Sequence, residues 1–212
     1  KNGMWEQRFY TDGKLAPAWG YQVDETASVI YGVYEHYLVT KNEKFLKDTL
    51  PMCEKAISFL KHYVKDWLDL DAEEILNKDK VKEEMEEQLR KNGKERKIHV
   101  SYDLWEMCEG IHLYSLATIY SAFATILKIY KALGKNVSDF DNNRLKEEKV
   151  QKNEKEIERL MAGVKKYIDT NLYDDSKKSY VRNTKDKKMD ISILGAVTPF
   201  NVYKPKEKKI LN

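Results

Sequence analysis

Residues 112–134 read "HLYSLATIYSAFATILKIYKALG", an apolar stretch with two lysines. Its large apolar side chains recur every three or four residues, the spacing of a helix, and they fall on two faces. One face carries Leu113, Leu116, Tyr120, Phe123, Leu127 and Tyr130, and the other carries Ile119, Ile126 and Leu133. Two apolar faces predict burial on two sides, and Gly134 is typical of a helix C-terminus. The stretch therefore predicts the core helix of an all-α fold.

Similar periodicity extends on both sides of this helix. Apolar residues at helical spacing predict helices over 24–40, 46–67 and 142–172. Asp24 is a plausible N-cap of the first. Pro51 lies near the start of the second, where a missing amide donor costs least or marks a short break. The chain is thus expected to be built from packed helices.

Two further segments separate or follow these helices. Residues 68–98 hold ten acidic and eight basic residues, which predicts a solvated, charged insertion. Residues 172–190, "LYDDSKKSYVRNTKDKKMD", indicate a turn-rich link that contains a possible hairpin. Residues 191–200, "ISILGAVTPF", indicate the opening of another buried helix that stops at Pro199.

Composition limits the class of protein. With 212 residues, 42% of them hydrophobic, the chain suits one domain with a substantial core. Its 38 basic and 35 acidic residues give a net charge of +3, so no nucleic-acid partner is expected. No apolar run is expected to reach membrane-spanning length, and no leader opens the chain. We therefore expect no membrane and a cytoplasmic location, with secretion left open.

The two cysteines, Cys53 and Cys108, lie far apart and have no CxxC or histidine-rich partner. They are interpreted as free buried thiols. No metal site and no cofactor is expected from this pattern.

A short polar stretch precedes the core helix. Residues 101–110, "SYDLWEMCEG", place Asp103 and Glu106 three residues apart with Trp105 between them. An indole offers a flat apolar face to a sugar ring, while carboxylates accept its hydroxyl protons. A carboxyl beside such a face is desolvated, which raises its pKa toward that of a general acid. Capping or surface hydrogen bonding explains most isolated pairs of this kind, so the motif alone leaves both interpretations open.

Three stretches together resemble parts of a known family. The first is 15–37, "LAPAWGYQVDETASVIYGVYEHY", and the second is 102–115, "YDLWEMCEGIHLYS". Each of these two precedes and enters a predicted buried helix. Together with "MDISILG" at 189–195, they resemble glycoside hydrolase family fifteen, which includes glucoamylases, glucodextranases and trehalases. The resemblance follows the order of the chain and covers most of it outside the charged insertion.

The resemblance implies an (α/α)6 toroid whose site lies at the N-terminal ends of the inner helices, and hydrolysis with inversion. Twelve helices need on the order of 400 residues, so residues 1–212 are expected to form an incomplete domain with about six to seven of them. By position, Glu106 is the general acid, and Arg182 is a weaker candidate for hydroxyl recognition. The residues implied to contact sugar are Trp19, Gln22, Asp24, Asp103, Trp105 and His112.

Three of these residues also have a purely structural interpretation. Asp24 would cap a helix, Trp19 would pack in the core, and His112 would pack at the start of its helix. Met107 and Cys108 stand where family members carry a second glutamate and often an arginine. The family's general base and its arginine-aspartate segment have no counterpart here, so we expect little or no hydrolysis by this chain alone.

The expected ligand is an α-linked glucose oligosaccharide or polysaccharide, and the parent enzyme is of glucoamylase or trehalase type. A non-enzymatic helical module that binds carbohydrate or another partner is the alternative. Half a toroid leaves apolar faces uncovered, which predicts self-association through its open edge.

Overall fold

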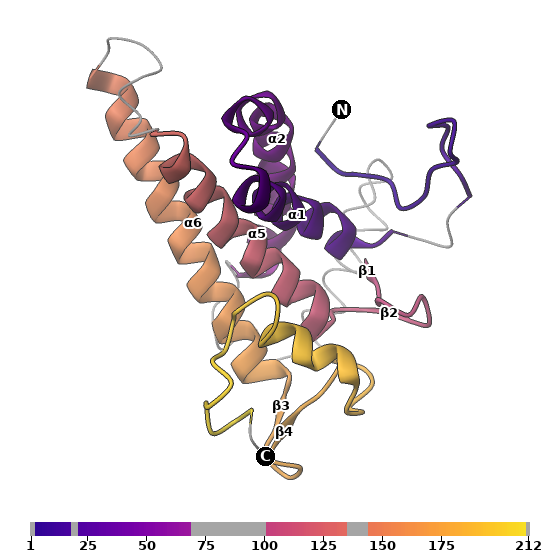
Figure 1. Cartoon of the computed structure of the whole chain (residues 1–212). Coiled ribbons are helices and arrows are strands. Elements are labelled where there is room, and N and C mark those ends of the chain that lie inside the picture. Colours follow the sequence, from indigo (N-terminus) through magenta and orange to yellow (C-terminus); the bar gives the residue numbers. More distant parts are fainter. Residues whose placement is uncertain (1–2, 18–20, 69–100, 135–143, 211–212) are drawn as a thin grey trace, which may run out of the picture.

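The computed structural model describes residues 3–17, 21–68, 101–134 and 144–210, with the backbone alone at 65–68 and 144–152. Four α-helices dominate this part of the chain: α1 (Val23–Thr40), α2 (Glu43–Leu68), α5 (Leu113–Ala132) and α6 (Arg144–Asn171) (Figure 1). A 3-10 helix, η2 (Ile191–Ala196), follows them. The predicted all-α class is confirmed. The charged insertion at 68–98 lies almost entirely outside the described residues.

Two small antiparallel hairpins complete the described elements. Strands β1 (Ser101–Tyr102) and β2 (Glu109–Gly110) pair with Ser101 opposite Gly110. Strands β3 (Tyr173–Asp174) and β4 (Ser179–Tyr180) pair with Tyr173 opposite Tyr180. The second pair confirms the predicted hairpin after α6.

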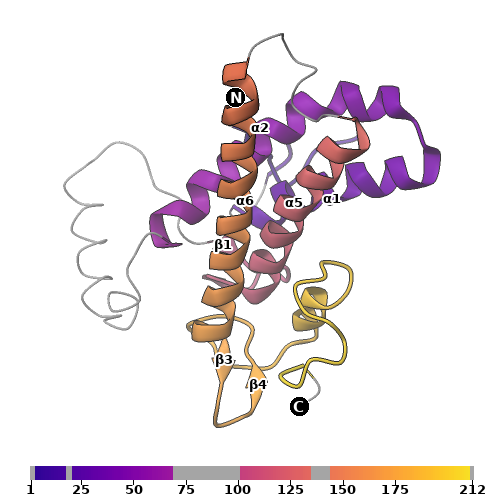
Figure 2. The ribbon, with the colours of Figure 1, turned by 90° about the vertical axis from the view of Figure 1, so that its left-hand side faces the viewer.

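Helix α5 forms the centre of the core, as its two apolar faces predict. It packs against α1, α2, α6 and η2, while α2 also packs against both α1 and α6. Figures 1 and 2 show α6 running along α5, with α1 on the other side of α5. The large side chains of α5 that are fully buried are Leu113, Leu116, Ile119, Phe123, Ile126 and Ile129.

The apolarity of α5 corrects one expectation. The helix, Leu113–Ala132, is long and apolar enough to cross a membrane by length and composition. However, 67% of its most apolar 18-residue window is buried inside the structure, as in the core helix of a globular fold. Helix–helix packing accounts for the hydrophobicity.

The start of α1 and the segment after β4 differ from their predictions. The N-cap of α1 is Gln22, and Asp24 is the second residue of the helix, so Asp24 is not the cap. Residues 191–196 form a 3-10 helix instead of a buried α-helix, with Ile191 68% and Leu194 51% exposed.

The reason for the short η2 lies in the residues that follow it. The amides of Val197 and Thr198 both donate to the Leu194 carbonyl, at 2.9 Å each, which closes a turn. Pro199 has no amide with which to continue the helix.

The N-terminal segment is anchored to α1 and α2 before it forms a hairpin. Gly3 is buried at φ +92°, and a Cβ there would lie 2.0 Å from the Lys55 carbonyl oxygen on α2. The Trp5 amide donates to Thr26 Oγ1 at 3.1 Å. Beyond this anchor, Arg8 accepts a hydrogen bond from the Ala16 amide at 2.9 Å, which closes a hairpin over 8–16.

The burial of α5 generates the first prediction. Replacing Ile126 with Ala removes three carbons from a fully buried position and should lower the free energy of unfolding by about 2–5 kcal/mol in urea denaturation. Val39→Ala, at a position 85% exposed, is the control and should change it by less than about 0.5 kcal/mol. Equal effects of the two substitutions would contradict the central place of α5.

Candidate functional site

The first turns of α1 and α5 meet at the β1–β2 hairpin. Ser101 links them, because its hydroxyl accepts from the Val23 amide at 3.0 Å and its carbonyl oxygen lies 3.0 Å from His112 Nε2. The Leu113 amide donates to the Arg182 carbonyl at 2.9 Å, which adds the segment after β4 to the same end of the bundle. The loop and helix starts that carry the described sequence-predicted residues, Gln22, Asp24, Asp103, Trp105, Glu106 and His112, are therefore brought together at one end of the helices, where Figure 1 shows β1 and β2 beside the start of α1.

Asp103 shapes the loop at 103–108 between the two strands. Its Oδ1 accepts hydrogen bonds from the amides of Met107 at 2.6 Å and Cys108 at 3.0 Å. Its Oδ2 is buried without a hydrogen-bond partner among the described residues, and the residue is only 5% exposed. Gln22 Nε2 donates to the Asp103 carbonyl at 2.6 Å, so the start of α1 is tied to this loop.

Glu106 stands at the tip of the same loop and pairs with Arg8. Its backbone is left-handed, at φ +56°, and its amide donates to the Asp103 carbonyl at 2.9 Å. Arg8 Nη2 contacts both carboxylate oxygens of Glu106, whose side chain is 25% exposed. Glu106 is therefore ion-paired as well as half-buried, and its partner comes from the N-terminal hairpin.

Asp24 is buried between the two helices. The Ser115 hydroxyl donates to its Oδ1 at 3.0 Å, and the residue is 4% exposed. Burial raises the pKa of Asp24 from 3.8 to about 6; the hydrogen bond from Ser115 opposes this shift and the negative charge of Asp103 adds to it. A carboxyl that titrates near neutrality thus sits behind the loop.

Glu25, which sequence reasoning left unassigned, lies within electrostatic reach of this group. Burial, together with the negative charges of Asp24 and Glu106, raises the pKa of Glu25 from 4.5 to about 7, and the positive charge of Arg8 opposes this shift. The sequence places Glu25 next to Asp24, but only the fold brings it under the electrostatic influence of Glu106 and Arg8.

Trp105 is joined to η2. Its indole N–H donates to Asp190 Oδ1 at 3.0 Å, and 48% of the residue remains exposed. Asp190 also accepts from the Ser192 amide at 2.8 Å as the N-cap of η2. Burial opposes ionisation of Asp190, yet these hydrogen bonds and Arg182 outweigh it and lower its pKa. Sequence reasoning missed Asp190, although it lies inside the "MDISILG" stretch.

The remaining predicted residues differ in outcome. Trp19 lies outside the described residues. His112 is buried at the N-cap of α5, and burial lowers its pKa despite the hydrogen bond to Ser101. In the part of the chain that the structure describes, its Nδ1 meets no partner at hydrogen-bond geometry. Arg182 donates through Nε to Asp186 at 3.0 Å, so its guanidinium is directed toward its own loop.

Cys53 and Cys108 are free thiols, Cys53 buried and Cys108 half-buried. Within the described ranges, His, Cys, Asp and Glu side chains form no group of three that suits a metal ion.

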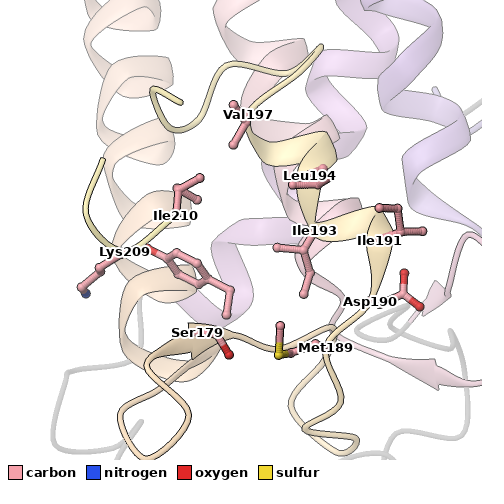
Figure 3. A pocket seen from close by; sticks show the side chains of 10 residues that line it. Ser179, Met189, Asp190, Ile191, Ile193, Leu194, Val197, Lys209 and Ile210 are labelled. Carbon is pink, nitrogen blue, oxygen red and sulfur yellow. The ribbon is translucent and has the colours of Figure 1, made fainter. Parts of the chain in front are cut away.

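An apolar pocket adjoins Asp190. Its volume is about 370 Å³, and it is bounded by the β3–β4 hairpin, η2 and the C-terminal stretch. Figure 3 shows Ile193 and Ile210 on opposite sides of it, with Asp190 at one edge. Met189, Ile191 and Leu194 line it and are themselves well exposed. The apolar surface of the pocket therefore begins beside Asp190, the residue to which Trp105 is hydrogen-bonded.

Comparisons with known proteins identify the class to which this arrangement is similar. No protein-family profile matches the chain. An uncharacterized glycosyl hydrolase of Methanocaldococcus jannaschii is 23% identical over 210 residues, which cover 99% of this chain and 27% of the relative. A solved glycosidase structure superposes with a TM-score of 0.64 at 16% identity, over 99% of this chain and 43% of that one.

This chain is similar to part of a glycosyl hydrolase. The structural likeness shows a shared fold, and the chain spans less than half the length of each of these two proteins. The comparisons support the broad class and do not distinguish family fifteen within it.

The burial of Asp24 generates a pH prediction. Its pKa is about 6 folded against 3.8 as the unfolded reference, so the folded state binds the extra proton. This contribution to stability is present below about pH 4 and is lost as the pH rises through 6. In urea unfolding, Asp24 should lower the free energy of unfolding of the wild type by on the order of 3 kcal/mol between these pH values. Asp24→Asn should not show this decrease.

Asp48→Asn, at an exposed carboxyl on α2, is the matched control and should leave the pH profile unchanged. An Asp24→Asn profile that coincides with the wild type would show that Asp24 titrates normally.

Proposed function

We propose that this chain carries one wall of the active site of a glycoside hydrolase that acts on α-linked glucose oligosaccharides or polysaccharides. The observation that supports this most directly is the convergence of Glu106, Trp105, Asp103 and Gln22 at the starts of α1 and α5. A half-exposed indole beside carboxyl groups suits a sugar ring, which needs both an apolar face and hydrogen-bond acceptors.

Each residue has a proposed role. Glu106 is the general acid that protonates the glycosidic oxygen, and Trp105 stacks on the sugar in the first subsite. Asp103 contacts the sugar in the same subsite, and its buried Oδ2 has no hydrogen-bond partner among the described residues. Gln22 and Asp24 support the pocket wall, and Trp19 is proposed to stack on substrate as the resemblance implies. His112 is proposed to hold the hairpin in place.

We further propose an (α/α)6 toroid of which this chain is a part. The packing of α1 on α5, of α2 on α1, and of α6 on both α5 and α2 supports an inner and an outer layer. Inverting hydrolysis needs a second carboxylate about 6.5–9.5 Å from the acid to activate water. We place that base outside these residues, so this chain alone hydrolyses little or nothing.

One observation favours the non-enzymatic alternative. Arg8 contacts both oxygens of Glu106, and a carboxylate held in this way has no free oxygen from which to donate a proton. A module that retains the sugar-binding wall without catalysis is consistent with this pairing.

Calorimetric titration with maltoheptaose and trehalose tests the proposal. We expect saturable binding, with Trp105→Ala weakening it by roughly 3- to 10-fold through loss of ring stacking. Trp105→Phe keeps a ring but loses the hydrogen bond to Asp190, and should fall between the two. Glu109→Gln, at the exposed carboxyl in β2, is the control.

Glucose release from maltoheptaose should remain at background for the wild type. The proposal would be contradicted if neither sugar bound, or if Trp105→Ala left the affinity unchanged. Binding of trehalose alone would favour a trehalase-type parent.

We also propose that the chain self-associates through the exposed rim of the apolar pocket beside Asp190. Met189, Ile191 and Leu194 present apolar surface beside a pocket, and covering it would remove this surface from water. Light scattering at several concentrations should show a dimer, and Leu194→Asp should shift it toward monomer. A wild-type monomer at all concentrations would contradict this expectation.

A further inference from the structure

We infer that Asp190 is a positioning residue for Trp105, and that its carboxylate holds the indole in the orientation in which a ring face is free to stack on a sugar. This inference deepens the proposed glycoside hydrolase function and rests on it. It assigns a role to a residue that lies outside the sequence-predicted set, 85 residues after Trp105.

The Trp105 indole is fixed through its only polar atom. Its Nε1–H donates to Asp190 Oδ1 at 3.0 Å. An indole has no second hydrogen-bonding group, so the Trp105 side chain has no donor left for a substrate hydroxyl. What this half-exposed side chain can offer a sugar is apolar ring surface. Its contact with a sugar is therefore ring stacking, which depends on the orientation of the ring.

Asp190 is itself held in place by two further contacts. Its Oδ1 also accepts from the Ser192 amide at 2.8 Å, and its Oδ2 lies 3.8 Å from Nη1 of Arg182. The side chains of Asp190 and Arg182 are only 16% and 15% exposed. Because both oxygens of the carboxylate have a fixed partner, the carboxylate can in turn fix the indole.

The element that begins at Asp190 is anchored to the core. Helix η2 packs against α5, and the Phe200 amide donates to the Gly195 carbonyl of η2 at 3.1 Å. The Phe200 ring meets the Tyr114 ring of α5 edge to face, with centroids 5.4 Å apart. The N-cap of α5, His112, also contacts the β1–β2 hairpin. Trp105 is thus held by its backbone through the hairpin and by its side chain through η2, and α5 supports both.

The alternative is that this hydrogen bond serves only to close the loop at 103–108. However, the Asp103 carboxylate already closes that loop, because it accepts from the amides of Met107 and Cys108 at 2.6 and 3.0 Å. Without Asp190, the half-exposed Trp105 ring would have several rotamers open to it. Ordering such a side chain on binding costs affinity, and the hydrogen bond to Asp190 removes this cost before the sugar arrives.

Two variants at position 190 separate positioning from helix capping. Asp190→Ser keeps a good N-cap for η2 but ends one bond short of the indole. Asp190→Asn keeps both the cap and an oxygen that can accept from Trp105. Both variants lose the negative charge beside Arg182, so they differ in whether they reach the indole. Asp175→Asn, at an exposed carboxyl in the β3–β4 turn, is the control.

NMR exchange of the Trp105 indole N–H with water measures the positioning in the absence of sugar. The signal is identified by its loss in Trp105→Phe. We expect this N–H to be protected in the wild type and to exchange several-fold faster in Asp190→Ser. Asp190→Asn should retain most of the protection, and Asp175→Asn all of it.

Calorimetry with maltoheptaose then links the orientation of the ring to binding. Asp190→Ser should weaken binding by roughly 2- to 10-fold, because the indole must then be ordered on binding. Asp190→Asn should restore most of the affinity. In the Trp105→Phe background, where the ring cannot donate a hydrogen bond, Asp190→Ser should weaken binding no further. Damage to the fold would instead weaken binding in both backgrounds.

The inference is overturned if Asp190→Ser leaves the exchange of the indole N–H unchanged, or if it weakens binding equally in the wild type and in Trp105→Phe. Sugar binding that depends on Trp105 but not on Asp190 removes the positioning role and leaves the proposed function standing. A protected indole N–H without binding of either maltoheptaose or trehalose removes the hydrolase proposal and, with it, the role assigned to Asp190.

Discussion

The hydrogen bond from the Ser115 hydroxyl to Asp24, 3.0 Å long and buried, fixes the starts of α1 and α5 against each other. Everything at the site follows from this constraint. Once the two first turns are adjacent, Ser101 can bridge them, and the hairpin that begins at Ser101 projects its loop over the helix ends. The cost is a carboxyl in a poorly solvated position, and burial accordingly raises its pKa. A stabilising contact between helices thereby creates the electrostatic character of the site.

The helices were predictable because their periodicity is a property of the local sequence. The two apolar faces of residues 112–134 located the core helix, and Gly134 follows it with a left-handed backbone at φ +62°. The exceptions depend on distant contacts. Asp24 has the chemistry of a cap, yet Ser115 engages it inside the helix while the backbone at Gln22 forms the cap. Residues 191–196 carry an apolar pattern, but turn hydrogen bonds after Leu194 end the helix before it lengthens.

The site was predictable only in part, for a similar reason. The motif at 101–110 lies on one loop, between β1 and β2, so its residues Asp103, Trp105 and Glu106 are local neighbours. Their charged partners are remote: Arg8 is 98 residues from Glu106, and Asp190 is 85 residues from Trp105. No local spacing relates such positions. Electrostatic pairing between separate segments therefore had to be observed in three dimensions.

Gly3 fits against the Lys55 carbonyl on α2 in a position that leaves no room for a Cβ. Only four residues separate it from Arg8, so this close fit fixes one end of the short segment that positions the Arg8 guanidinium. A methyl group at position 3 would push that segment away from α2 and change the charge felt by Glu106 without touching it. The ion pair between Arg8 and Glu106 thus depends on a backbone position that has no side chain at all.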